Sequence, residues 1–361
     1  MTKAIYVYRY AILLLVLHVA ASVFAFEYFK STPVIITSSV YVTYAALCAI
    51  IAAPCILIAL TIKLFVNKHP NPTTELIQMS RFWFNNNHNG IHIITTYVLF
   101  LATFSVFGTV KSTLPQLVPF QYDLFFYQLD QKIFGVDPYE LLLPIFGGDW
   151  QLFILNNAYQ AWLVAMVASI LWVTFSSNHL RRLEYLFASI LSFAISGNLL
   201  AVTFSSAGPC FFGPLLGLDY YAPLLDHLNE VNERTGTVWA LVGQHLLWDY
   251  YANSKGFISG ISAMPSLHTI FAWLWVFAAW QHRALRIVTI IYAIMIFIGS
   301  IVLGWHYAVD GIAGFVLALL AWAAARPIAR ASLRGAEGPA GVFASDQLQK
   351  TGSPARKTIR S

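Results

Sequence analysis

Apolar residues along this chain gather into long runs, and short polar or basic segments separate one run from the next. Most runs hold roughly 20 residues, the length at which an α-helix crosses the hydrocarbon core of a bilayer. The pattern predicts an all-α polytopic membrane protein with about eight transmembrane helices. The predicted helices are residues 6–26, 34–65, 91–110, 152–175, 183–204, 270–280, 287–303 and 306–325.

Two longer stretches without a spanning run interrupt this pattern, residues 111–150 and 205–260. The first is aromatic and acidic, and it indicates either short helices at the membrane interface or an ordinary structured loop. The second carries the turn signals Gly208-Pro209 and Gly213-Pro214, so we expect a long loop there.

A signal peptide is the alternative interpretation of the first helix, since it follows Lys3 and Arg9 and contains a possible cleavage site at residues 23–25. Its apolar run is long for a signal peptide, so we favour a retained helix. Beyond residue 326 the composition turns rich in Gly, Ser, Pro and Arg, which predicts disorder. The expected parts are three N-terminal helices (1–110), a five-helix domain with two long outer loops (111–325) and a basic tail (326–361).

Composition supports the membrane assignment, because 58% of the residues are hydrophobic and only 10% are charged, against about 25% charged in soluble domains. The three cysteines, Cys48, Cys55 and Cys210, make no disulfide framework. The net charge of +5 comes mostly from the tail and the basic turns, so it does not indicate nucleic-acid binding.

Lys and Arg are divided unevenly between the two sides of the predicted bundle. The side with both termini holds 16 of them and the other side holds 5. The positive-inside rule then places both termini in the cytoplasm and the two long loops outside or in a lumen. We expect a plasma, inner or Golgi-type membrane.

Two polar segments flank a predicted helical hairpin. They are SAMPSLHT at residues 262–269 and GWHYAVDGIAG at residues 304–314. A hairpin of two helices returns the chain to the side that it left, so His268 and His306 share one end of the bundle. Asp310 follows His306 by four residues and therefore lies on the same helix face. The pattern thus predicts a cluster of two imidazoles and one carboxylate on the extracytoplasmic side.

These residue types suit phosphoryl transfer. A neutral imidazole can attack phosphorus, a carboxylate one turn on can fix its tautomer, and a second imidazole can protonate the leaving oxygen. We expect Pro265 in the first turn of its helix, which leaves the N–H groups of Ser266, Leu267 and His268 free to bind phosphate.

Three other interpretations of the cluster stay open. Two His and one Asp can ligate zinc, but no further ligand string accompanies them, and we expect neither a metal nor a cofactor. A transporter would use such residues as a proton relay at mid-span, whereas these stand at helix ends. A structural membrane protein would need no aligned polar cluster.

The strings Met264-Pro265-Ser266-Leu267-His268 and His306-Tyr307-Ala308-Val309-Asp310 resemble the type 2 phosphatidic acid phosphatase superfamily. The resemblance is greatest to the branch that contains inositol phosphorylceramide synthases. Residues 205–209 and 129–135 are also similar to that branch, and the resemblance covers roughly residues 114–325. It implies that His306 is the nucleophile, Asp310 its partner, His268 the general acid and Ser266 a phosphate contact.

The chain departs from phosphatases of that superfamily at the cations that hold the phosphate charge. It lacks their Lys…Arg-Pro string, and it has Leu267 where they have Gly and Ile301 where they have Arg. These departures argue against a generic phosphatase and a vanadate-dependent peroxidase, and they are typical of the synthase branch. Besides helix N–H groups, the candidates to stabilise the phosphate charge are Ser205, Ser206, Ser262, Lys132 and Lys255.

Together these features predict an enzyme that transfers a lipid head group through a phosphohistidine-type intermediate, with a phospholipid or lipid phosphate as substrate. Leu267, Lys255 and the serines named above are the expected substrate contacts. Water as acceptor is the alternative, and it would make the protein a lipid phosphate or polyprenyl diphosphate phosphatase.

Overall fold

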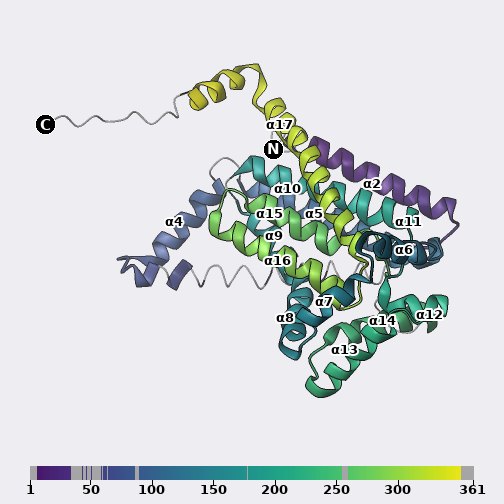
Figure 1. The fold of residues 1–361 in the computed structure, drawn as a ribbon. Coiled ribbons are helices and arrows are strands. Elements are labelled where there is room, and N and C mark those ends of the chain that lie inside the picture. Colours follow the sequence, from purple (N-terminus) through teal and green to yellow (C-terminus); the bar gives the residue numbers. More distant parts are fainter. Residues whose placement is uncertain are drawn as a thin grey trace.

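The computed structural model describes residues 6–33, 64–85, 89–176, 178–253 and 259–350, with isolated positions at 43, 46, 50, 58 and 60–62. Within these residues every regular element is a helix, as the hydrophobic pattern predicts. Figure 1 shows long helices bundled together, with shorter helices gathered at one end. The predicted second helix, residues 34–65, lies mostly outside the described residues.

Five helices of the described chain are long and apolar enough to cross a membrane. They confirm an integral membrane protein, although the sequence predicts about eight helices. Their apolar segments are Arg9–Tyr28 (α2), Gly90–Leu117 (within α5, Asn89–Leu117), His179–Thr203 (α10, His179–Leu191; η2, Ser192–Leu200; α11, Ala201–Thr203), Arg283–Val302 (α16) and Ala308–Arg334 (within α17, Ala308–Lys350).

Two predicted helices differ from simple spans. The predicted helix at 152–175 is a bent pair, α8 (Asp149–Gln160) and α9 (Trp162–Thr174), with 44° between its halves, and it counts as a sixth span if the halves are joined. The predicted helix at 270–280 is α15 (Leu267–Ala279), whose 13 residues are too few to cross about 30 Å of hydrocarbon.

The basic segment after Arg326 continues α17 rather than losing structure. Residues 326–334 pack against the start of α2, because the Arg9 guanidinium donates hydrogen bonds to the carbonyls of Ala331 and Ser332. The prediction of disorder is therefore wrong for these nine residues, where α2 supplies partners that the composition does not reveal. Between the predicted helices at 34–65 and 91–110, where the hydrophobic pattern predicts no helix, the structure has helix α4 (Pro72–Asn85).

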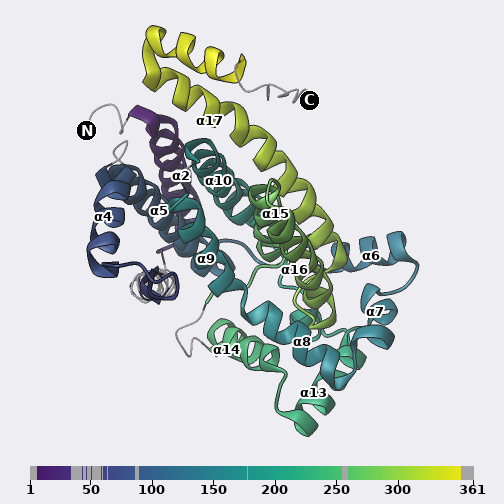
Figure 2. The same ribbon diagram turned by 90° about the vertical axis from the view of Figure 1, so that its left-hand side faces the viewer.

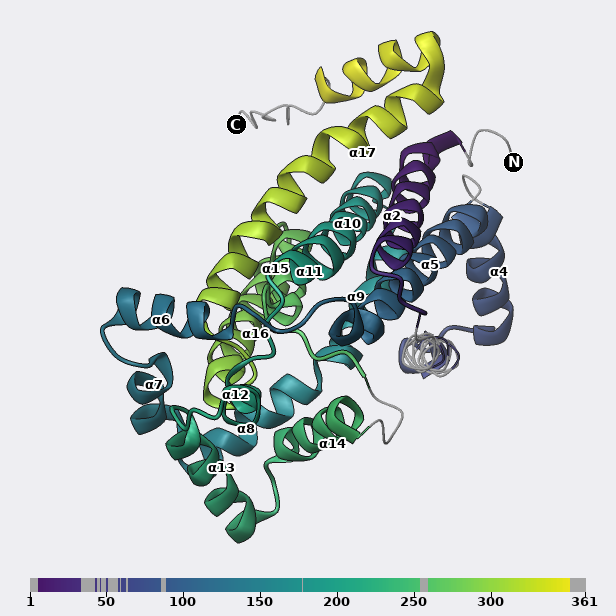
Figure 3. The same ribbon diagram turned by 90° about the vertical axis from the view of Figure 1, so that its right-hand side faces the viewer.

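The two long outer stretches fold into short helices. Figures 2 and 3 show these helices at the end of the bundle opposite the start of α2. The stretch at 205–260 is therefore not one long loop; Gly236, for example, ends α13 in the left-handed conformation at φ 65°. The short helices are α6 (Asp123–Phe134), α7 (Pro138–Phe146), η3 (Pro209–Phe211), α12 (Phe212–Leu216), α13 (Ala222–Thr235) and α14 (Trp239–Asn253).

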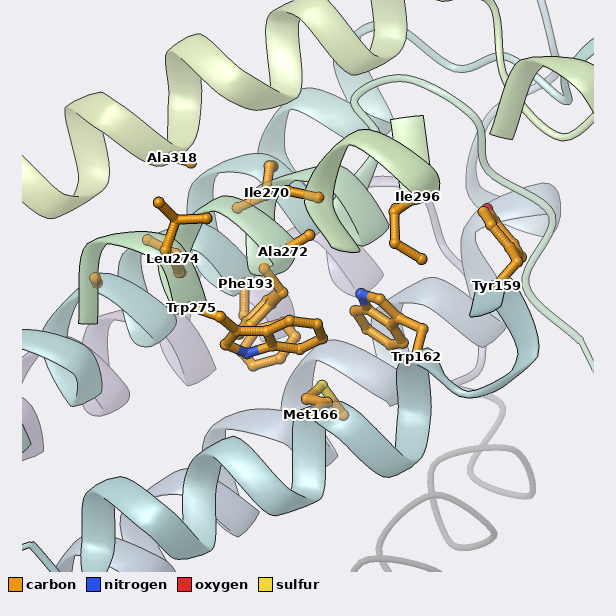
Figure 4. Close-up of a cluster of buried hydrophobic side chains, with 14 of the residues drawn as sticks. Tyr159, Trp162, Met166, Phe193, Ile270, Ala272, Leu274, Trp275, Ile296 and Ala318 are labelled. Carbon is orange, nitrogen blue, oxygen red and sulfur yellow. The ribbon is translucent and has the colours of Figure 1, made fainter. Parts of the chain in front are cut away.

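Helix α15 lies at the centre of the bundle, where it packs against α9, α10, α16 and α17. Figure 4 shows its Trp275 beside Trp162 of α9, with Met166 close to both rings. Phe193 of η2 lies against Phe271 of α15, with ring centroids 4.6 Å apart. Since close packing holds membrane helices together, this core fixes the position of the first turn of α15.

Candidate active site

Ser266 caps the N-terminus of α15 and fixes its first turn. Its hydroxyl accepts a hydrogen bond from the Thr269 N–H, and its own N–H donates to the Asp310 carbonyl. Pro265 precedes the cap and therefore lies outside the helix, so its predicted place in the first turn is wrong. The Ser266 N–H, expected to be free for phosphate, is bonded to Asp310 instead. Gly314 of α17 permits this close approach, because a Cβ there would lie 2.9 Å from the Ser266 carbonyl oxygen.

His306 and Asp310 form a buried pair at the start of α17. The His306 Nδ1 lies 3.3 Å from the Asp310 Oδ2, which also accepts the Tyr307 N–H at 3.0 Å. The Asp310 side chain is fully buried and that of His306 is 7% exposed. The His306 N–H donates to the Ser300 carbonyl, so both the backbone and the side chain of His306 are fixed.

His268, one residue into α15, faces His306 at a ring-centroid distance of 6.1 Å. Its imidazole stacks on Tyr159 at 4.5 Å and lies against Trp162 at 4.4 Å, so two aromatic rings set its orientation. The Trp162 indole N–H also donates to the His268 carbonyl. The short hairpin of α15 and α16 thus brings the two imidazoles to one site.

Two buried carboxylates of α6 hold the loops around this pair, and the sequence analysis assigned neither of them a role. Asp123 accepts hydrogen bonds from the N–H groups of Ala207 and Gly208 and from the Tyr307 hydroxyl. Asp130 accepts the N–H groups of Ala308 and Val309, the first two residues of α17. These bonds satisfy free donors at a helix N-terminus and fix the residues that directly follow His306.

Burial shifts the pKa values of these groups toward their neutral forms. It raises the pKa of Asp130 to about 7, although the hydrogen bonds from Ala308 and Val309 act in the opposite direction. It lowers the pKa of His306 to about 3; the charge of Lys111 acts in the same direction, and a hydrogen bond with the Ala263 backbone opposes both. His306 is therefore a neutral imidazole at physiological pH.

A cavity of about 320 Å³ opens in front of the two imidazoles. Among the expected site residues, Ser262, Leu267, His268 and His306 line it. Most of the remaining wall is apolar or aromatic and comes from α5, η2, α9 and α14. The cavity thus joins the imidazoles to the interior of the helical bundle, which suits a ligand with a polar head and an apolar chain.

The other expected contacts lie elsewhere. Ser206 is buried, and its hydroxyl accepts the Met264 N–H, which ties residues 205–208 to the segment before α15. Ser205 is buried too, and neither serine lines the cavity, nor does Ser266. Lys132 is exposed on α6, and Lys255 lies outside the described residues.

The sequence analysis assigned no role in the site to several residues that the structure places around the imidazoles. Tyr159 and Trp162 stack on His268, and Trp305 and Lys111 line the cavity. Lys111 carried a usable signal, because it ends a long apolar run, where a charged residue is costly and commonly functional. The part of the chain that the structure describes holds no cluster of three or more metal-ligating side chains.

A model of the PAP2 superfamily matches residues 126–324, a region that begins in α6 and ends in α17. It includes both imidazoles, Asp310 and the carboxylate of Asp130. No curated protein and no solved structure matches the sequence.

Proposed function

Because the chain belongs to the PAP2 superfamily, it is a phosphatase or phosphotransferase that acts on a phosphorylated substrate, and we propose that this substrate is a membrane phospholipid whose head group it transfers. The observation that carries the proposal is the buried pair of His306 and Asp310, which faces His268 across an aromatic cavity inside a membrane bundle.

The reaction proceeds in two displacements at phosphorus. With Nδ1 of His306 held by Asp310, Nε2 attacks phosphorus, the bond to the leaving oxygen breaks, and His268 gives that oxygen a proton. The phosphorylated head group is then bonded to His306. In the second displacement His268 takes the proton of an acceptor hydroxyl, whose oxygen bonds to phosphorus and releases His306.

Two features favour a lipid or sugar alcohol over water as the acceptor. Helix α14 and the segment 259–262 form part of the largely apolar wall of the cavity, and the Gln244 amide fixes α14 by donating to the Leu303 carbonyl at 2.8 Å. An apolar wall limits the access of water to a reactive intermediate. The strings around His268 and His306 also resemble those of inositol phosphorylceramide synthases.

We place the active site on the extracytoplasmic or lumenal face of the membrane. Arg9 contacts residues 331 and 332, Arg326 pairs with Glu184, and Arg181 bonds to Gln281. Basic residues from three segments therefore meet at one end of the bundle, beside the turn at 281–286, and we infer that this end is cytoplasmic by the positive-inside rule. Helix α17 begins toward the other end, where the short outer helices lie (Figure 3), and His306 precedes its first residue, Ala308, in sequence.

The test compares head-group transfer with phosphate release by the purified full-length protein. It is offered phosphatidylinositol with ceramide, phosphatidic acid, and a polyprenyl diphosphate, with His306→Ala as the blank. We expect a new phospholipid without free phosphate. Free phosphate that His306→Ala does not release would establish the phosphatase alternative, and an absence of turnover on every phosphorylated lipid would contradict the proposal.

A further inference from the structure

Ser196 of η2 places a hydroxyl in the wall of the cavity that His268 and His306 also line. The residue is only 3% exposed, yet its oxygen is not sealed off by protein atoms, so the space that it reaches is the cavity. Within the described chain this hydroxyl makes no hydrogen bond. By contrast, the hydroxyls of Thr103 and Ser112 on α5 donate to the carbonyl four residues earlier, which occupies them.

The π-helical form of η2 explains why this hydroxyl faces the cavity. In a π-helix the hydrogen bonds join residues five apart, so Ser196 and Ala201 come to one face and both line the cavity. On the α2 side of η2, the Asn198 amide donates to the His18 Nε2 at 2.6 Å. Both of these side chains are buried, so this bond fixes η2 against α2. Single π-helical segments are rare and occur often at functional sites.

Gly197 connects Ser196 with the start of α15. A Cβ at Gly197 would lie 3.1 Å from the Leu267 Cδ1 and 2.8 Å from the ring of Phe107, so η2 lies directly against the residue that precedes His268. Phe107 cannot give way easily, because its ring stacks on Phe193 at a centroid distance of 4.7 Å. The Ser196 hydroxyl therefore lies on the side of the cavity where His268 begins α15.

The surroundings of this hydroxyl restrict the ligand that it can bind. Its neighbours in the wall include Gly197 and the aromatic ring of Phe107, which offer no polar side chain. A group bound there needs an oxygen that accepts a hydrogen bond on an otherwise apolar segment. An acyl ester has this chemistry, because its carbonyl oxygen accepts but cannot donate and stands where a lipid head group joins its chains.

We propose that the Ser196 hydroxyl donates a hydrogen bond to an ester carbonyl of the phospholipid donor and so holds the leaving oxygen beside His268. The inference rests on the proposed function, because it takes the acylated part of the donor as the leaving group. The oxygen that His268 protonates belongs to that part, only a few bonds from the ester carbonyls. Ser196 is then a binding residue that favours acylated lipids over ether lipids and isoprenoid chains.

The experiment compares two phospholipid donors that differ only in their linkages, a diester and the matching diether, which lacks the carbonyls. The full-length protein is assayed with Ser196→Ala and with the matched control Ser192→Ala, which removes a buried hydroxyl of η2 that does not line the cavity. We expect Ser196→Ala to raise KM for the diester about fivefold and to change kcat less than about twofold, since the bond is present before and during reaction. KM for the diether should not change, and Ser192→Ala should alter neither KM.

The two donors separate carbonyl binding from a structural role, because a distorted cavity would affect both equally. Equal losses on diester and diether, or an unchanged KM for the diester, would overturn the inference.

Equilibrium binding of the same lipids to His306→Ala gives a test without turnover. We expect the diester to bind about fivefold more tightly than the diether, and the added variant Ser196→Ala to abolish the difference. Equal binding of the two lipids when Ser196 is present would contradict the inference whether or not that variant folds. A carbonyl preference that depends on Ser196, in a protein that transfers no head group, would overturn the proposed function and leave the carbonyl site standing.

Discussion

In the proposed mechanism the chemistry depends on His306 and Asp310. The Asp310 carboxylate orients the imidazole through Nδ1 and stabilises the imidazolium character that develops when Nε2 reacts. Its Oδ2 also accepts the Tyr307 N–H, and its second oxygen, Oδ1, has no hydrogen-bond partner among the described residues. The pair is therefore arranged for reactivity, and stability alone would not require it.

Replacing Asp310 by Asn keeps the size of the side chain but removes its charge. We expect kcat to fall on the order of a thousandfold, because the amide stabilises neither the required tautomer nor the imidazolium. Steady-state kinetics with the phospholipid donor measure the change, and Asp226→Asn, at an exposed position of α13, is the matched control. Wild-type kcat in Asp310→Asn would exclude a role in catalysis.

The lowered pKa of His306 predicts an unusual pH profile. With a pKa of about 3, the reactive neutral form persists as the pH falls from 7 to 5, whereas an ordinary histidine of pKa about 6.5 would become protonated. We expect kcat/KM with the phospholipid donor to change less than about threefold over this interval. A loss of more than about tenfold would show that His306 titrates normally.

Lys111→Met should move the acid limb of that profile to higher pH. The lysine charge disfavours protonation of His306, so its removal raises the pKa of the imidazole. The measurement is kcat/KM from pH 3 to 7 for the variant and the wild type. An unchanged limb would place the ammonium too far from the nucleophile.

The sequence alone located His268, His306 and Asp310, because helix spacing and a hairpin determine which side chains meet. It did not identify Lys111, which the count of outer charges treated as one of five equivalent residues. Nor did it separate the capping role of Ser266 from phosphate binding, since both use the same position at the start of a helix. Such distinctions depend on packing between distant segments, for example Gly260 against Lys111.

At the scale of elements, α6 connects the parts of the site. Its two carboxylates bind the backbone after α11 and the first turn of α17, so one short helix fixes two loops distant in sequence. The acidic character of residues 111–150 was visible in the sequence. The partners of Asp123 and Asp130 were not, because they are backbone groups and one tyrosine hydroxyl more than 80 residues away.

Asp130→Ala removes both acceptors of the Ala308 and Val309 N–H groups and leaves these donors buried. We expect a loss of about 3 kcal/mol of stability and a lower kcat, since the first turn of α17 carries the catalytic pair. Thermal unfolding in detergent checks the first effect, with Lys132→Ala on the exposed face of α6 as the control. An unchanged melting temperature would mean that α6 does not brace this turn.

At the scale of the whole molecule, the clustered basic residues lie at one end of the bundle and the candidate active site lies toward the other. The hydrophobic pattern predicted the all-α membrane fold and most of its long helices. The apolar run at 270–280 is already shorter than a bilayer, and α15 has only 13 residues. The pattern could not show that protein surrounds this helix, because an apolar run has the same composition whether lipid or protein surrounds it. The helices of residues 205–260 were missed since each is too short to span a bilayer, and tertiary contacts stabilise them.

Cysteine labelling tests the orientation in intact cells. In a background without the three native cysteines, Arg283→Cys in the basic turn should resist an impermeant thiol reagent, whereas Glu230→Cys on α13 should react. Both positions are exposed, so access to the reagent depends on the side of the membrane. The reverse labelling pattern would place the active site in the cytoplasm.

The central claim is that His306 becomes bonded to phosphorus, and trapping that bond tests it most directly. The protein is incubated with a phospholipid donor labelled at phosphorus, without acceptor, and quenched in alkali, because a phosphorus–nitrogen bond is labile in acid. We predict acid-labile label on His306 in the wild type and none in His306→Ala. Label retained by His306→Ala, or head-group transfer at the wild-type rate in that variant, would contradict the mechanism.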